Sequence, residues 1–284
     1  MTLILWCVTP DFVYQVSDRR LIWADGRVED DERNKAVLVD GRFAFGYTGL
    51  AEIGGVKTDE WLARVAADGP THDMSAILTR IRDRATEAFR SINIFPEYKG
   101  HAFQGVGWVF DRGFPGGVPA VLTTGNVLDS DHNWLPAAND VFDSRYRFFD
   151  GLTNGFEVGS VGQGIAQDHK EDVLHRIEQL ARRAAPPGEM LGALVDGVRY
   201  LAEWYRSIGH SLMAISIPRS AALRFVQSGR MAALSSGPLE SHTTFLYVSS
   251  DNRTESYGPH FATPGAAMTN FRTAPLSPPE PEIE

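Results

Sequence analysis

The first third of the chain alternates short apolar runs with turn residues, which is typical of β-strands. Residues 3–8 are apolar throughout, and a Pro-Asp turn separates them from a second run at 12–16. After a polar loop, the run at 36–39 is separated from the run at 42–47 by Asp40-Gly41. Asp-Gly between two apolar runs is a strong signal for a β-hairpin. The pattern therefore predicts two consecutive hairpins at the start of the chain.

Helical periodicity follows these strands. Thr58 and Asp73 are each placed to cap a helix, and the longer second helix has one apolar face. Strand-like runs return between 103 and 156, around 106–110, 119–124 and 145–149. Two more amphipathic helices are predicted around 173–181 and 191–205, and two last strands at 212–217 and 243–248.

The order of these elements indicates the fold class. Separate blocks of strands and helices favour an α+β protein with mainly antiparallel sheets and helices packed outside, and they argue against an alternating Rossmann pattern. We see no internal repeat and no break in composition, so one domain is predicted over residues 2–273. Residues 274–284 are rich in Pro and Glu, and a disordered tail is predicted there.

Composition narrows the function classes. The chain has 284 residues and a net charge of -9, so it offers no basic field for nucleic acid or an anionic membrane. A single cysteine, Cys7, excludes an internal disulfide and a Cys-rich zinc site, and its place in a strand predicts a core thiol. The apolar start is too short for a signal peptide, and no stretch reaches the length of a membrane span. We therefore expect a cytoplasmic protein.

Candidate chemistry begins at Thr2, which directly follows the initiator Met1. A hydroxyl is a poor nucleophile until a base takes its proton. An N-terminal Thr carries its own base, because a free α-amino group has a pKa of about 7.7–8.0. Aminopeptidases generally remove Met when a small residue follows. A Met-Thr start is common, however, and by itself it is weak support for catalysis.

Three downstream positions strengthen the case. Asp18 lies at the end of the second predicted strand, in Ser17-Asp18-Arg19-Arg20; Lys35 opens the third strand, and Gly49 follows the fourth. In this order and spacing, the chain resembles the proteasome-type N-terminal-nucleophile (Ntn) hydrolases. These threonine peptidases include proteasome β-subunits and the peptidase subunit of the bacterial two-component protease.

The resemblance implies a role for each residue. Thr2 would be the nucleophile and, through its amine, the general base. Lys35 would place a positive charge near the hydroxyl, and Asp18 would hold Lys35. The backbone N–H of Gly49 would stabilise the oxyanion, and Arg20 would fix the loop that carries Asp18. Each of these residues also has an ordinary interpretation, as a hairpin turn residue or a surface charge, so the prediction depends on their joint occurrence.

Two serines complete the predicted site. The stretch around Gly159-Ser160-Val161-Gly162 resembles the family's Gly-Ser-Gly turn, so Ser160 is predicted to orient the Thr2 amine. A glycine-rich loop that ends a strand explains the same stretch almost as well. The family's Asp-x-x-Ser-Gly group lacks its Asp here, and Ser207 is the residue that would keep part of its role.

The resemblance also implies a fold and an activity. The fold would be a four-layer αββα Ntn-hydrolase sandwich of two mainly antiparallel sheets. The activity would be amide hydrolysis through an acyl-enzyme on Thr2, as in a threonine protease acting on peptides, without a metal or organic cofactor. Family members usually form rings, which implies a homo-oligomer and raises the option of an ATPase partner.

Two alternatives stay open at the level of sequence. One is a non-catalytic structural or binding member of the same fold. The other is a small-molecule amidase, whose pocket would be shaped by the long region 103–156 with Trp108 and Trp134.

Overall fold

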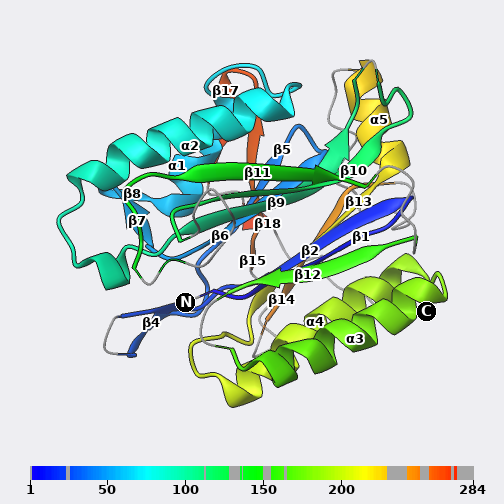
Figure 1. Cartoon of the computed structure of the whole chain (residues 1–284). Coiled ribbons are helices and arrows are strands. Elements are labelled where there is room, and N and C mark those ends of the chain that lie inside the picture. The colour runs from blue at the N-terminus through cyan, green and yellow to red at the C-terminus, as the bar shows by residue number, and fades with distance from the viewer. Residues whose placement is uncertain are drawn as a thin grey trace, which may run out of the picture.

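Two large β-sheets pack face to face in the computed structural model, with helices on both outer surfaces (Figure 1). The structure describes residues 2–23, 26–111, 113–127, 135, 137–149, 155–162, 165–228, 242–249, 256–269 and 272–273. This mixture of sheets and helices confirms the predicted α+β class.

The first sheet has five strands and contains the N-terminal hairpin. Its order is β12 (Glu157–Val161), β1 (Ile4–Val8), β2 (Phe12–Asp18), β13 (Leu212–Pro218) and β14 (Thr244–Val248). All neighbours in this sheet are antiparallel. The strand β1 is thus an inner strand, held on one side by β2 and on the other by β12, which brings residues far apart in the sequence next to the N-terminus.

The second sheet has seven strands and contains the other predicted hairpin. Its order is β11 (Asp143–Phe148), β10 (Val118–Gly125), β9 (Ala102–Val109), β6 (Phe43–Thr48), β5 (Ala36–Val39), β16 (His260–Thr263) and β17 (Ala266–Met268). At the β5–β6 turn, Asp40 and Gly41 have φ angles of 50° and 60°. Asp-Gly suits this turn because Gly, and to a lesser extent Asp, tolerates the left-handed region.

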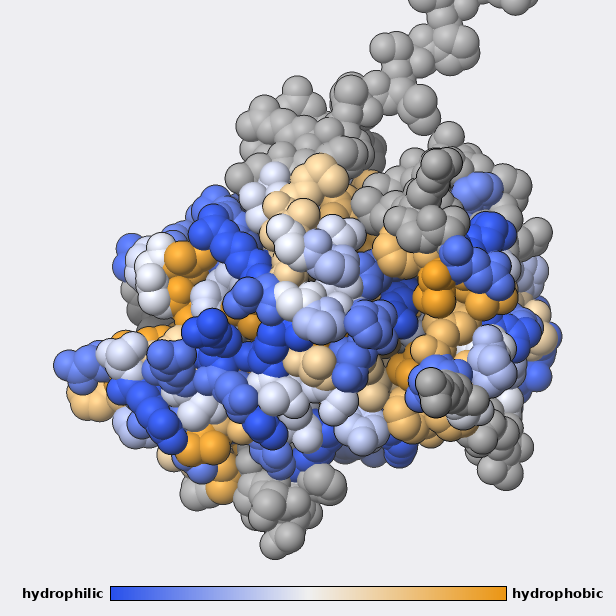
Figure 2. Space-filling model, turned by 90° about the horizontal axis from the view of Figure 1, so that it is seen from above, coloured by the Kyte–Doolittle hydropathy of each residue, from blue (hydrophilic) through white to orange (hydrophobic). Residues whose placement is uncertain are grey.

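Helices cover the outer face of each sheet. The helices α1 (Thr58–Ala67) and α2 (Met74–Ser91) lie on the seven-stranded sheet, and α3 (Gln167–Arg182) and α4 (Pro187–Trp204) lie on the five-stranded sheet (Figure 1). Seen from above, hydrophilic residues cover much of the surface and hydrophobic ones form separate patches (Figure 2). A polar outer side and an apolar inner side are what an amphipathic surface helix requires.

Smaller elements complete the chain. They are the pairs β3 (Leu21–Ile22) with β4 (Val28–Asp30), β7 (Glu52–Ile53) with β8 (Val56–Lys57) and β15 (Ser256–Tyr257) with β18 (Arg272–Thr273), a 3-10 turn at Pro96–Tyr98, and α5 (Arg219–Ser228). Within the described ranges, every helix is too short or too polar to cross a bilayer.

The strand alternation divides the side chains of β1 between two cores. Leu3, Leu5 and Cys7 pack against the α3 and α4 side, while Trp6 and Val8 pack between the two sheets. Successive side chains of a strand point to opposite faces, so this division follows directly from the extended backbone. By the same period of two, Thr2 belongs to the side that faces the second sheet.

The structure changes two local predictions and confirms a third. Thr58 is not the cap of α1 but its first residue; Lys57 takes the cap position, and the Thr58 hydroxyl donates to the Leu50 carbonyl at 2.7 Å. Asp73 does cap α2, accepting from the N–H of Ala76 at 3.1 Å. The stretch around Ser160 is not a turn but part of strand β12.

The two tryptophans predicted to shape a pocket and the predicted tail have separate outcomes. Trp108 is fully buried in the core between the sheets, where its indole N–H donates to the Ile217 carbonyl at 2.9 Å, so it does not shape a pocket. Trp134 and the predicted tail at 274–284 lie outside the described residues.

Candidate active site

Thr2 lies where the two sheets meet. Its main-chain nitrogen donates to the hydroxyl of Thr48, at the end of β6, over 3.4 Å. Thr2 is 4% exposed. Thr2, which precedes β1 of the first sheet, is therefore hydrogen-bonded directly to Thr48, which precedes Gly49 at the end of β6 in the second sheet.

Asp18 connects several segments around Thr2. Its Oδ1 accepts from the N–H of Leu3 at 2.7 Å, and its Oδ2 accepts from the N–H of Arg20 at 3.0 Å and of Gly209 at 3.3 Å. The same Oδ2 lies 3.3 Å from the ammonium of Lys35. One carboxylate thus joins the start of β1, the end of β2 and the loop after α4.

Asp18 and Lys35 form a buried ion pair, with both side chains 0% exposed. The Lys35 ammonium also donates to the carbonyl of Arg20. Burial lowers the pKa of Lys35, and the negative charge of Asp18 opposes this lowering. The predicted pairing of these two residues is present in the structure, directly beside the backbone that carries Thr2.

Arg20 fixes the loop after α4, as well as the end of β2. Its guanidinium pairs with Asp31 and donates to the carbonyls of Arg206 at 2.8 Å and Ile208 at 3.2 Å. Ser207 lies in this loop, where it is half-buried. The contacts that connect the loop to Asp18 and Arg20 come from main-chain atoms of the neighbours of Ser207.

Gly49 occupies a position that only glycine fits. Its φ angle is +116°, and a Cβ placed there would lie 2.4 Å from the carbonyl oxygen of Gly100 and 2.6 Å from Nδ1 of His101. A side chain is excluded both by the backbone conformation and by the lack of space. The predicted oxyanion residue therefore sits on a tightly fitted segment at the rim of the cavity described below.

Ser160 is not placed beside Thr2. In the β1–β12 ladder it lies opposite Leu5, and Val161 lies opposite Ile4. The residue of β12 that approaches Thr2 is Gly162, whose Cβ, if it had one, would lie 2.9 Å from the Thr2 carbonyl oxygen. A role for Ser160 in orienting the amine stays a prediction, and the register does not favour it.

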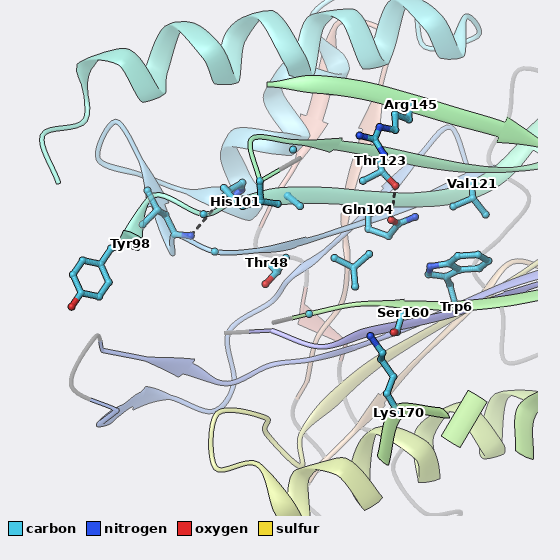
Figure 3. Close-up of a pocket in the computed structure, with 18 of the residues that line it drawn as sticks. Trp6, Thr48, Tyr98, His101, Gln104, Val121, Thr123, Arg145, Ser160 and Lys170 are labelled. Atoms are coloured by element: carbon cyan, nitrogen blue, oxygen red, sulfur yellow. Dashed lines mark hydrogen bonds between the residues drawn. The ribbon is translucent and has the colours of Figure 1, made fainter. Parts of the chain in front are cut away.

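A cavity of about 850 Å³ opens between the two sheets next to Thr48 and Gly49. Gln104, Thr123 and Arg145 line it from the seven-stranded sheet (Figure 3). Trp6 and Ser160 line it from the five-stranded sheet, and Lys170 from α3, while Trp23 and Tyr98 are further lining residues. The hydroxyl of Thr123 donates to the buried amide oxygen of Gln104 at 2.8 Å. The region 103–156 thus does contribute to a pocket, through side chains other than Trp108.

Cys7 is a core thiol, as predicted. It is 0% exposed, and burial raises its pKa to about 12. A thiol that is neutral and enclosed cannot act as a nucleophile.

Comparisons with known proteins bear on the fold. No family model matches the chain, and no curated protein does. Among solved structures, the chain is similar to a mutant of Anbu from Hyphomicrobium sp. strain MC1, with a TM-score of 0.51 and 12% identity, over 89% of each chain. The chain has the fold of Anbu, a bacterial proteasome-like protein. At this identity the similarity concerns the fold alone, so the chemistry is argued from the residues around Thr2.

Two residues of the site were not predicted. Thr48 stands directly before Gly49, and its position at a strand end next to a predicted oxyanion residue was an available signal. Gly209 is separated from Asp18 by most of the chain, and only the pairing of β13 with β2 brings them together. No local pattern indicates that contact.

Proposed function

We propose that residues 2–273 form one Ntn-hydrolase domain of the αββα type, which cleaves amide bonds through an acyl-enzyme on Thr2 once Met1 is removed. The observation that supports this best is the fully buried ion pair of Asp18 and Lys35, bonded to the backbone next to Thr2. The peptidase activity and the N-terminal processing are both part of the proposal.

Stability alone does not explain why this chain keeps a buried ion pair at Asp18 and Lys35. Each ion loses its hydration, and a pair of packed apolar side chains is often as stable or more stable at such a site. A scaffold that only had to join β1, β2 and the loop after α4 would have no need for Lys35. A nucleophile at Thr2 does need it, because a nearby ammonium favours the unprotonated amine and the developing alkoxide.

The proposed reaction has two halves. The free amine of Thr2 takes the hydroxyl proton as Oγ1 attacks the substrate carbonyl carbon, and the N–H of Gly49 donates to the oxyanion. The amine then passes the proton to the leaving nitrogen, the C–N bond breaks and an ester on Thr2 remains. Water attacks this ester and gives one proton to the amine; the bond between the acyl carbon and Oγ1 then breaks, and the amine returns that proton to Oγ1, which releases the carboxylic acid and restores Thr2. The oxyanion donor contributes about 3–4 kcal/mol in comparable enzymes.

Peptides are the substrate class we propose, bound with a side chain in the cavity between the sheets. As in proteasome-like proteins, we propose a homo-oligomer; a ring and an ATPase partner are extensions of the same proposal. A small-molecule amidase is a second candidate, favoured by one observation: the cavity volume of about 850 Å³ falls within the range of small-molecule sites.

Hydrolysis assays on purified protein test the proposal. Fluorogenic peptides and small acyl amides are compared for the wild-type protein, Thr2→Ala and Thr2→Ser. We expect turnover by the wild type, reduced turnover by Thr2→Ser, which keeps a hydroxyl beside the amine, and none by Thr2→Ala. Preference among the substrates decides between peptidase and amidase. Equal turnover by Thr2→Ala would exclude Thr2 as the nucleophile, and no turnover by any form would favour a non-catalytic member of the fold.

A further inference from the structure

The segment that carries Gly49 rests on a histidine far away in the sequence. The N–H of Leu50 donates to Nδ1 of His101 at 3.0 Å. Gly49 itself packs against Gly100 and His101 so closely that no Cβ fits there. The peptide between Gly49 and Leu50 is therefore held by a hydrogen bond on one side and by close backbone packing on the other.

His101 is itself held in one orientation. Its main-chain N–H donates to the side-chain oxygen of Asn126 at 2.8 Å, and the N–H of Asn126 donates back to its carbonyl at 3.1 Å. The imidazole stacks on the ring of Tyr47, with 5.9 Å between centroids, and meets Phe103 edge-on at 4.6 Å. The ring is 1% exposed, so it has no space to rotate.

The surroundings of His101 also fix its protonation state. Burial lowers its pKa to about 3, so the ring is neutral near pH 7. Because Nδ1 accepts from Leu50, the ring proton must be on Nε2. Within the described part of the chain, Nε2 has no hydrogen-bond partner. A site selected for stability alone would favour an apolar ring here, since an unpartnered buried donor is destabilising.

We propose that His101 is a positioning residue for the oxyanion hole: its neutral Nδ1 holds the Gly49–Leu50 peptide and, through the tightly packed Gly49 Cα, restrains the adjoining Thr48–Gly49 peptide, so that the N–H of Gly49 points at the reacting carbonyl. This inference rests on the proposed function of Thr2 and Gly49. His101 acts through the backbone and not on the substrate. Since the oxyanion forms only in the transition state, misalignment lowers kcat and leaves substrate binding nearly unchanged.

Two substitutions at His101 separate positioning from packing. His101→Asn keeps an acceptor near the position of Nδ1, whereas His101→Leu keeps an apolar side chain and removes the acceptor. With the best peptide substrate, we expect His101→Leu to lose about 10- to 100-fold in kcat, below the full effect of deleting an oxyanion donor, with KM changed less than about threefold. His101→Asn should recover most of kcat. His175→Leu, at an exposed position on α3, is the matched control and should behave as the wild type.

The acylation rate of Thr2 by a β-lactone is the second readout, because attack on the lactone carbonyl uses the same oxyanion donor. A wild-type rate in folded His101→Leu, or a change in KM alone, would overturn the role of His101 and leave the proposed function standing. No acylation of the wild type would overturn both.

Nitrogen NMR of the wild-type imidazole covers the case in which His101→Leu does not fold. We expect a neutral ring with its proton on Nε2 from pH 8 down to about pH 4, as the lowered pKa requires. A ring that carries its proton on Nδ1, or that titrates near pH 6.5, cannot accept the N–H of Leu50 over this whole pH range. Either result would contradict the inference.

Discussion

Replacing Lys35 by Met removes the positive half of the buried ion pair and leaves the carboxylate of Asp18 charged, with neither side chain exposed to solvent in the native structure. Breaking such a pair by removing one partner typically costs about 3–5 kcal/mol. Asp18 keeps its hydrogen bonds from Leu3, Arg20 and Gly209, but these three N–H groups do not balance a full charge. We therefore expect Lys35→Met to lower the free energy of unfolding by about 3–5 kcal/mol.

The double variant Asp18→Asn with Lys35→Met tests this reasoning further. Asparagine is neutral, and its oxygen can still accept from Leu3. Its amide group then faces the N–H groups of Arg20 and Gly209, which lose their acceptor. Leaving these donors unpaired costs about 1–3 kcal/mol, so the double variant should be more stable than Lys35→Met but less stable than the wild type. Both variants should be inactive, because neither has the ammonium that the proposed mechanism requires beside Thr2.

Urea unfolding followed by circular dichroism measures these stabilities, with substrate hydrolysis measured in parallel. Lys57→Met, at an exposed position, is the control and should change the unfolding free energy by less than about 0.5 kcal/mol. The reasoning is refuted if Lys35→Met unfolds like the wild type, or if the double variant keeps substantial activity. The second result would show that the ion pair is only structural.

Three further predictions follow from single sites. Gly49→Ala should be inactive and less stable by about 2–4 kcal/mol in urea unfolding, because its Cβ would meet the Gly100 carbonyl at a left-handed φ; unchanged stability would contradict the geometry. His101 has a folded pKa of about 3, below its unfolded value of 6.5, so the unfolded state binds the extra proton. The contribution of His101 to stability should then fall by up to about 1.4 kcal/mol per pH unit between pH 6.5 and about 3, and His101→Asn should show a shallower slope between pH 6.5 and 4.5. Cys7 should resist iodoacetamide in the native protein and react fully in urea, as mass spectrometry would show, because it is buried with a raised pKa.

Local periodicity predicted much of the fold because its elements are amphipathic. The apolar faces of α2 and α4 follow from burial on one side. The strands β2 and β9 are buried along almost their whole length, so short apolar runs between turn residues indicated them instead. What local patterns did not predict are the long-range pairings. β16 lies parallel to β5, more than 200 residues away in the sequence, and β12 pairs with β1; neither pairing leaves a local signal in the chain.

In the candidate site too, residues close together in the sequence could be predicted, and contacts that depend on long-range pairing could not. Asp18 and Lys35 could be predicted because their order and spacing after Thr2 resemble those of a known family, and the structure pairs them. The glycines around Ser160 predict a turn. In the structure, Gly159 is needed where the ring of Trp6 crosses the strand, since a Cβ there would lie 2.2 Å from that ring. His101 could not be found from sequence, because its contact with Leu50 depends on the pairing of β6 with β9.

The central claim is that Thr2 is a nucleophile with a free amine. Intact-mass measurement of the purified protein after treatment with a β-lactone tests it most directly. The account predicts a species without Met1 that carries one lactone adduct, and no adduct on Thr2→Ala. Retention of Met1 without any adduct on the wild-type protein would contradict it, because Thr2 would then have no amine to serve as its base.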